Sequence, residues 1–143
     1  MNPILKNIIS LFIGAIVGGF INMQTVELGY SVFPLGDFDK NNFDAFVSAM
    51  ENAENKHYIF PFLAHAFGTF VGATLASLFG ANHQFRLAII IGIFFLIGGI
   101  AANLMIPGPL WFSIMDILLA YIPMAWIGHI LASKYVSSRK SNV

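Results

Sequence analysis

Cysteine is absent from this sequence of 143 residues, and charged residues are scarce. The absence of cysteine excludes disulfide bonds, thiolate metal ligands and cysteine nucleophiles. Only 10% of the residues are charged, whereas a soluble domain usually carries about 25%. The net charge is zero and the lysines and arginines are scattered, so nucleic acid is not an expected partner. Water is therefore not the main solvent of this chain.

Motifs that bind common cofactors or activate nucleophiles are also missing. The sequence has no P-loop, no dinucleotide fingerprint, no GxSxG nucleophile elbow and no HExxH zinc motif. Imidazole and carboxylate side chains that could act as metal ligands are present, but their spacing matches no ligand pattern. They are Glu27, His57, His65 and Asp116. The sequence therefore predicts neither a metal site nor a bound cofactor.

Four long apolar runs dominate the sequence, which is 57% hydrophobic. Each run is close to the roughly 20 residues that a helix needs to cross a bilayer. We therefore expect an all-α polytopic membrane protein, forming a single domain over residues 1–143 with the lipid bilayer as its surroundings. The expected transmembrane helices cover residues 3–23, 58–81, 87–106 and 110–131, with a long outer loop at 24–57 and a cytoplasmic tail at 132–143.

The long loop at 24–57 has two parts. Its first part, LGYSVFPLGDFD, is rich in glycine and proline and predicts turns. Further along, apolar residues recur at the helical period. They are Phe43, Phe46, Val47 and Met50. The opposite face is acidic, so we expect an amphipathic helix in the membrane interface, capped by Asp39 or Asn41. This helix would be either a lid over the bundle or a plain surface connector.

The distribution of basic residues predicts the orientation in the membrane. Four spans place both ends of the chain on one side, and an excess of Lys and Arg marks the cytoplasmic side. Most of the basic residues fall on the side of the termini, namely Lys6, Arg86, Lys134, Arg139 and Lys140. We therefore expect a multi-pass protein of a bacterial inner membrane, with both termini in the cytoplasm and the loop at 24–57 outside.

Small residues recur along one face of the predicted spans. Burial of apolar surface does not drive helix association in lipid, so small residues favour it by letting two backbones approach closely. We expect five glycines to lie in contacts between helices. They are Gly14, Gly18, Gly68, Gly72 and Gly99.

The fourth span contains a proline and a histidine. Pro123 has no backbone N–H and should kink the helix near Leu119. His129 lies close to the inner end of the span, where a side chain can reach the lipid headgroups. The sequence therefore favours an interfacial anchor over a proton relay for His129.

One polar residue from each span falls in the outer half of the membrane. A rise of about 1.5 Å per residue places His65 and Asp116 roughly 10 Å below the outer surface. Asn22 and Asn103 lie near the outer ends of their spans. An Asp inside a membrane costs about 2.5–3.5 kcal/mol, so Asp116 needs a partner. We expect a His65–Asp116 pair whose hydrogen bonds are completed by Asn22 and Asn103, serving as a substrate or proton pathway or only holding the helices together.

These features are compatible with three functions. The first is transport of protons or a small solute through the polar cluster; four helices make a thin wall, so a homodimer or larger homo-oligomer is expected. The second is a membrane-embedded enzyme in which His65 and Asp116 act as acid and base on a lipid-borne substrate. The third is an accessory subunit whose small-residue faces dock a larger membrane partner. Transport is the function that we favour.

Overall fold

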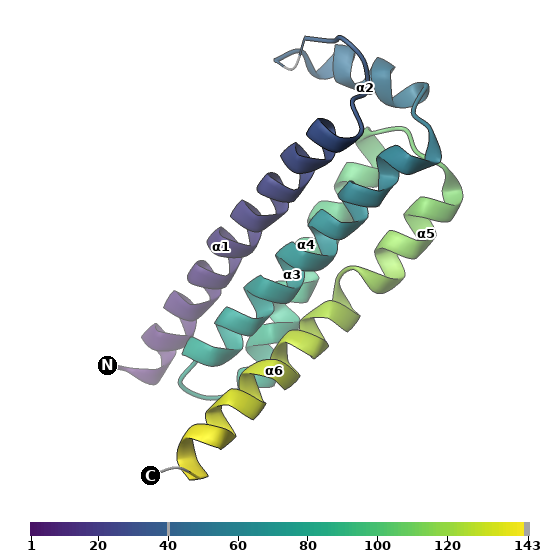
Figure 1. The fold of residues 1–143 in the computed structure, drawn as a ribbon. Helices are drawn as coiled ribbons and strands as arrows, with labels where there is room; N and C mark the ends of the chain where they lie inside the picture. The colour runs from purple at the N-terminus through teal and green to yellow at the C-terminus, as the bar shows by residue number, and fades with distance from the viewer. Residues whose placement is uncertain (40, 142–143) are drawn as a thin grey trace.

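The computed structural model describes residues 1–39 and 41–141. Within these residues every regular element is a helix (Figure 1). In chain order the elements are α1 (Pro3–Val32), α2 (Phe43–Glu51), the short 3₁₀ helix η1 (Asn55–Tyr58), α3 (Ile59–Phe79), α4 (Gln84–Met105), α5 (Leu110–Leu119) and α6 (Ile122–Ser141). Four segments are long and apolar enough to cross a membrane: α1, η1 with α3, α4, and α5 with α6. The all-α fold with four candidate spans is as predicted.

The first helix is longer than the first predicted span. It continues past residue 23 to Val32, so the glycine- and proline-rich stretch forms turns only from Phe33 onward. The reason is that proline first appears in this stretch at Pro34, and the residue before a proline disfavours the helical conformation. The single glycine in the extra turns, Gly29, packs directly against the Phe60 ring of α3. Contact with α3 therefore supports the additional helical turns.

Helix α3 lies at the centre of the bundle, in contact with α1, α4 and α6. The contact between α1 and α3 is close because glycines face the opposing backbone. A Cβ atom at Gly14 would lie 2.5 Å from the carbonyl oxygen of Gly72, and one at Gly18 would lie 2.5 Å from that of Gly68. Four of the glycines expected in helix contacts thus meet in two pairs at this interface.

The last span is interrupted rather than smoothly kinked. Helix α5 ends at Leu119 and α6 begins at Ile122, with a turn between them. Pro123 lies in the first turn of α6, where backbone N–H groups have no partner within the helix, so its missing N–H costs no hydrogen bond. The predicted distortion near Leu119 is therefore present, and it is a full break. This break turns the Tyr121 side chain into the bundle, where only 1% of the residue is exposed.

Helix α2 lies across the end of the bundle that is opposite the two termini (Figure 1). Its N-cap is Asn42, whose side-chain oxygen accepts hydrogen bonds from the backbone N–H groups of Asp44 and Ala45. The predicted caps were wrong: Asp39 instead accepts a hydrogen bond from the backbone N–H of Asn41 in the preceding turn. On the inner side of α2, Met50 is buried against side chains from η1 and α5.

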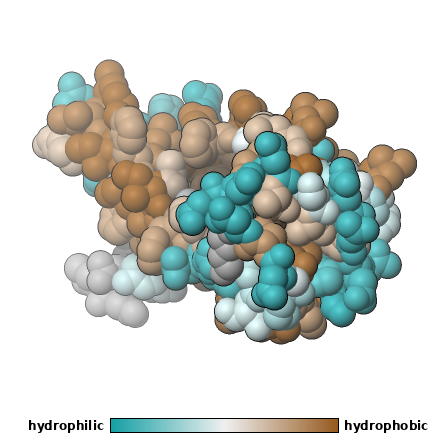
Figure 2. Space-filling view, turned by 90° about the horizontal axis from the view of Figure 1, so that it is seen from above, coloured by the Kyte–Doolittle hydropathy of each residue, from teal (hydrophilic) through white to brown (hydrophobic). Residues whose placement is uncertain are grey.

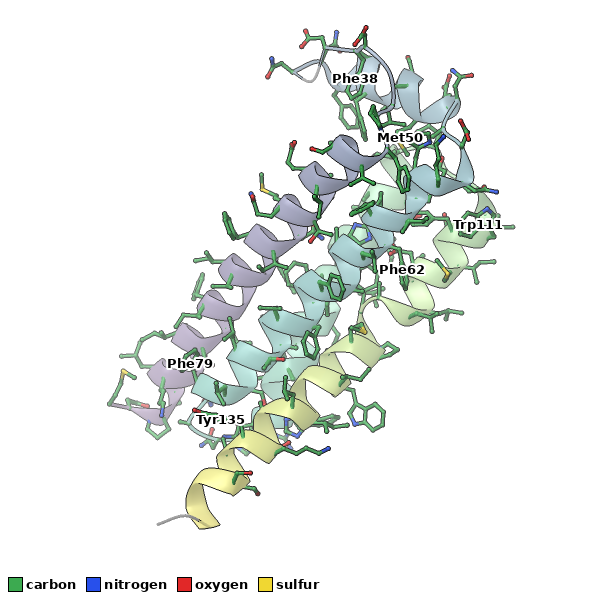
Figure 3. The ribbon with its side chains drawn as sticks, in the orientation of Figure 1. Phe38, Met50, Phe62, Phe79, Trp111 and Tyr135 are labelled. Carbon is green, nitrogen blue, oxygen red and sulfur yellow. The ribbon has the colours of Figure 1, made fainter. Side chains whose placement is uncertain are left out.

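Large apolar side chains cover the outward-facing sides of the long helices, and Figure 3 shows them projecting from the bundle along its length. The most exposed examples include Phe12, Ile16, Phe20, Phe94, Ile97, Leu104 and Leu118. Seen from above, hydrophilic residues gather beside apolar ones on the face with α2 (Figure 2). Trp111 and Tyr135 lie toward opposite ends of the bundle (Figure 3), as expected of aromatic residues at two membrane interfaces.

Candidate functional site

The centre of the candidate site is Asp116, which is completely buried in the last turns of α5. Its Oδ1 atom lies 2.8 Å from Nδ1 of His65 on α3. Its Oδ2 atom accepts a hydrogen bond of 2.8 Å from the Tyr121 hydroxyl and one of 3.2 Å from Nδ2 of Asn103 on α4. The carboxyl group is therefore surrounded by partners from three other parts of the bundle. We call His65, Asn103, Asp116 and Tyr121 the outer polar cluster.

The Tyr121 hydroxyl joins two members of the cluster. It donates to Oδ2 of Asp116 and lies 2.9 Å from Nδ1 of His65. Space for this hydroxyl comes from Gly99 on α4, because a Cβ atom there would collide with it. Gly99 was expected to bring helices together, and here it admits a tyrosine into the bundle.

Tyr121 is the cluster member that the sequence analysis missed. On a regular helix, residue 121 would point well away from residue 116, since five residues turn the chain through about 500°. The break before Pro123 removes that constraint. Two signals in the sequence bear on this position: Pro123 predicts the distortion, and a tyrosine buried in lipid needs a partner for its hydroxyl.

Asn22 does not join the cluster, contrary to the prediction. Within residues 1–39 and 41–141, no hydrogen bond links Asn22 to His65 or Asp116. Its Cβ atom instead packs 3.0 Å from the position of a Cβ atom on Gly68. Asn22 thus lies in the α1–α3 contact, whereas His65 faces α5 and α6. The direction in which Asn22 points therefore differs from the prediction.

The pairing of His65 with Asp116 links the hydrogen-bonding roles of the imidazole ring to the protonation of the carboxyl group. When Asp116 is ionised it can only accept, so Nδ1 of His65 carries the proton and donates. If the ring is neutral, the second ring nitrogen, Nε2, is then an acceptor. A carboxylate that orients an imidazole in this way holds one tautomer in place.

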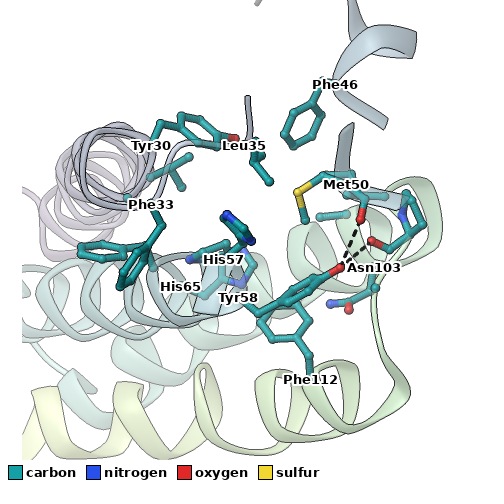
Figure 4. Close-up of a pocket in the computed structure, with 18 residues that line it drawn as sticks. Tyr30, Phe33, Leu35, Phe46, Met50, His57, Tyr58, His65, Asn103 and Phe112 are labelled. Atoms are coloured by element: carbon teal, nitrogen blue, oxygen red, sulfur yellow. Dashed lines mark hydrogen bonds between the residues drawn. The ribbon is translucent and has the colours of Figure 1, made fainter. Parts of the chain in front are cut away.

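A pocket of about 130 Å³ lies directly above the cluster, between the bundle and the loop that carries α2. His65 and Asn103 contribute to its lining, so the cluster is accessible from this side (Figure 4). Six aromatic side chains line it, namely Tyr30, Phe33, Phe46, Tyr58, Phe60 and Phe112. Among residues 1–39 and 41–141, neither lysine nor arginine lines the pocket.

Hydrogen bonds hold the covering segments over this pocket. The Tyr58 hydroxyl lies 3.4 Å from the carbonyl oxygens of Met50 and Pro107, and so joins the end of α2 to the turn between α4 and α5 (Figure 4). Nε2 of His57 lies 3.3 Å from the carbonyl oxygen of Pro34. The loop is thus attached to the bundle at both sides of the pocket.

A second polar pair lies in the other half of the bundle. The Ser77 hydroxyl on α3 lies 2.8 Å from Nδ1 of His129 on α6, and Ser77 is almost fully buried. The His129 ring packs edge-on against Phe85 of α4. His129 therefore bonds inward to a buried hydroxyl, which corrects the expected role as an anchor directed toward the headgroups.

Between the two polar groups lies Thr69, one turn along α3 from His65. Thr69 is completely buried, and its hydroxyl has no hydrogen-bond partner in the described part of the chain. Thr25 and Thr74 satisfy their hydroxyls on the backbone carbonyl one turn earlier, which is the usual arrangement in a helix. An unpartnered buried hydroxyl costs about 1–3 kcal/mol, so Thr69 calls for an explanation beyond packing.

No metal site accompanies the cluster: within the described ranges, no three histidine, aspartate or glutamate side chains are grouped so that they could hold an ion. The fold and the site together define a small all-α chain of membrane-length helices with an ionisable cluster buried in the bundle. No protein-family model, curated protein or solved structure matches the chain. The functional argument therefore depends on the geometry alone.

Proposed function

We propose that this chain is a small integral membrane transport protein that moves protons or a small solute through the outer polar cluster. The observation that carries the proposal is a fully buried Asp116 paired with His65, which lines a pocket beneath the α2 loop. Ionisable residues inside membrane helices are expensive, and they typically mark ion or proton pathways.

The seam between α3 and α6 supports a route from the cluster toward the other end of the bundle. On α3, Thr69 lies one turn from His65 toward Ser77, and His65 and Ser77 both form contacts with the last span. Their partners there are Tyr121, in the break before α6, and His129 on α6. Protons can move along such hydroxyl and imidazole groups when water bridges them.

The route is closed in the present conformation. About 12 Å of helix separates Thr69 from Ser77, at a rise of about 1.5 Å per residue. Fully buried alanines, Ala73 and Ala125, occupy this interval. A movement of α6 about the break at residues 120–121 would separate these alanines and admit water. We therefore propose that the break is the hinge of the transport cycle.

We further propose a multi-pass position in a bacterial inner membrane, with both termini in the cytoplasm. The support is charge: six of the seven carboxylates lie between residues 27 and 54, at the end that carries α2, and most basic residues lie toward the other end. Positive charge favours the cytoplasmic side. Helix α2 would then rest in the outer interface as an amphipathic lid, with Met50 and Phe46 directed inward.

A homo-oligomer, such as a dimer, is part of the same proposal. Gly19 on α1 and Gly98 on α4 have open space where a side chain would be. Small residues on an outward surface favour helix association in lipid, because they allow two backbones to approach closely. A second copy would also thicken the wall around the route.

The test is proton flux in sealed vesicles that contain the purified protein and a pH-sensitive dye. Asp116→Asn removes the charge and is expected to abolish most of the flux. Asn22→Ala, at a similar depth but outside the cluster, is the matched control and should transport like the original chain. Thr69→Val should slow the flux while Thr69→Ser retains it. Equal flux from Asp116→Asn and the original chain would contradict the proposal.

A membrane-embedded enzyme is the second candidate, favoured by one specific observation. His65 is oriented by a carboxylate and lines an apolar pocket, which is the arrangement of a general base. The pocket's aromatic walls suit the apolar part of a lipid-borne substrate. Turnover of such a substrate without any ion flux would favour this candidate over transport.

A further inference from the structure

Two atoms on the floor of the pocket lack protein partners. They are Nε2 of His65 and Oδ1 of Asn103, for which the described residues provide no hydrogen bond. Both side chains line the pocket, and these two atoms are not buried in the protein interior (Figure 4). These atoms are therefore available to a molecule in the pocket.

The surrounding hydrogen bonds make Oδ1 of Asn103 the free acceptor, and Nε2 of His65 is a second acceptor when its ring is neutral. Nδ2 of Asn103 donates to the Gly99 carbonyl at 3.0 Å and to Asp116 at 3.2 Å, so the amide oxygen must be the free atom. When Asp116 is ionised and the His65 ring is neutral, Nδ1 of His65 donates to Asp116 and Nε2 keeps a lone pair. A ligand that donates hydrogen bonds therefore satisfies Asn103 and, in this state of the ring, His65 as well.

The walls and the size of the pocket limit the rest of the ligand. Six aromatic side chains surround it, and aromatic faces attract cations within about 6 Å. The volume of about 130 Å³ is close to that of an apolar cavity of about 150 Å³ that binds benzene. The pocket thus suits a body of the size of one aromatic ring.

The charge around the pocket favours a cation over an anion. Among the described residues, no lysine or arginine lines the pocket, so only the imidazoles of His57 and His65 could balance a negative ligand there. Asp116 lies directly behind the floor. Six carboxylates lie in the segment from residue 27 to residue 54, which contributes much of the cover. Long-range attraction from this acidic end raises the local concentration of cations.

We propose that the pocket above the outer polar cluster binds a small organic ammonium ion, with an apolar body against the aromatic walls and N–H groups directed at His65 and Asn103. Binding itself requires only the pocket; that such an amine is the transported solute rests on the proposed function. An ammonium ion that leaves this site inward would follow the seam between α3 and α6.

The binding test uses a tryptophan that already neighbours the pocket. The Trp111 ring lies 6.2 Å from Tyr58 and 6.1 Å from Phe112, and both of these residues line the pocket. Trp126→Phe leaves Trp111 as the single tryptophan. Titration with benzylammonium in detergent is expected to change its fluorescence saturably. Benzoate, with the same ring and opposite charge, is expected to give no saturable change.

A second control tests the N–H groups. Benzyltrimethylammonium keeps the charge but lacks N–H groups, so it should bind at least about tenfold more weakly than benzylammonium.

Two variants locate the site. Asn103→Leu removes the floor oxygen and should weaken benzylammonium binding about tenfold, whereas Asn22→Leu, outside the pocket, should not change it. Phe33→Leu removes one aromatic wall without touching the cluster and should weaken binding about threefold, which keeps the test valid if Asn103→Leu does not fold. The inference would be overturned if benzoate bound as tightly as benzylammonium. It would also be overturned if benzylammonium gave no saturable response.

The two proposals fail in different ways. Saturable benzylammonium binding without any flux in vesicles would support the pocket assignment and contradict transport. Proton flux that depends on Asp116, in a protein that does not bind benzylammonium, would support transport and overturn the pocket assignment.

Discussion

At the scale of single residues, the chain concentrates its polarity where helices meet. Asp116 is tolerated in a membrane-length bundle because His65, Asn103 and Tyr121 satisfy both of its oxygens. Removing one partner of a buried polar group leaves the other unsatisfied, and this penalty exceeds the net value of an ordinary hydrogen bond. Each member of the cluster is therefore expected to be sensitive to substitution.

Tyr121→Phe tests the least expected member of the cluster. The change removes only the hydroxyl, which donates to Asp116 at 2.8 Å, and should lower the free energy of unfolding by about 1–3 kcal/mol. Chemical unfolding in detergent measures it. Tyr58→Phe is the control, because its hydroxyl makes only long hydrogen bonds of 3.4 Å to carbonyl groups, and should cost less than about 1 kcal/mol. A Tyr121→Phe protein as stable as the original would contradict this account.

At the scale of the elements, close backbone approach organises the bundle. Helix α1 reaches α3 through Gly14 and Gly18, which face the carbonyl oxygens of Gly72 and Gly68. The break between α5 and α6 has the opposite effect, since it opens the helix and directs Tyr121 inward. The close packing of α1 on one side of α3, and the break between α5 and α6 on another, thus place the cluster against α3.

Neighbouring glycines on α1 allow a matched test of this packing. A Cβ atom at Gly18 would lie 2.5 Å from the Gly68 carbonyl oxygen, whereas one at Gly19 meets nothing within 4 Å. Gly18→Ala should therefore destabilise the fold by about 1–3 kcal/mol. Gly19→Ala should leave the fold of one copy intact or stabilise it by up to about 1 kcal/mol. Thermal unfolding in detergent compares the two, and a larger loss for Gly19→Ala would refute the assignment of the packed face.

The elements also show what sequence reasoning can reach. Apolar runs of bilayer length identify the four spans. The similar positions of His65 and Asp116 along their helices identify their contact. Both predictions require only the number of residues along each helix. The end of α1 and the direction of Asn22 depend on how α1 rotates against α3, which is set by the glycine contacts. Tyr121 depends on the path of the chain through a helix break. Neither rotation nor the path through a break is encoded in periodicity.

At the scale of the whole molecule, charge is divided between the two ends. Every carboxylate except Asp116 lies between residues 27 and 54. This end carries α2 and the pocket, while both termini lie at the other (Figure 1). The asymmetry supplies both the proposed orientation and the attraction of a cation to the pocket.

The absence of cysteine makes the orientation directly testable. Ser48→Cys on α2 and Ser137→Cys on α6 each introduce one exposed thiol into a chain that has none. In intact spheroplasts, a membrane-impermeant maleimide should label only Ser48→Cys, and lysis should allow both variants to react. If only Ser137→Cys is labelled before lysis, the orientation is the opposite of the one proposed.

The contact between His65 and Asp116 is the claim on which the site, the pocket and the route all depend. The most direct measurement is a double-mutant cycle on unfolding in detergent, with His65→Ala, Asp116→Asn and both together. A coupling of at least about 0.5 kcal/mol is expected for residues in contact. Asn22→Ala combined with Asp116→Asn should be additive within about 0.3–0.5 kcal/mol. Additive effects of His65→Ala and Asp116→Asn would contradict the account, because the two side chains would then not share one buried cluster.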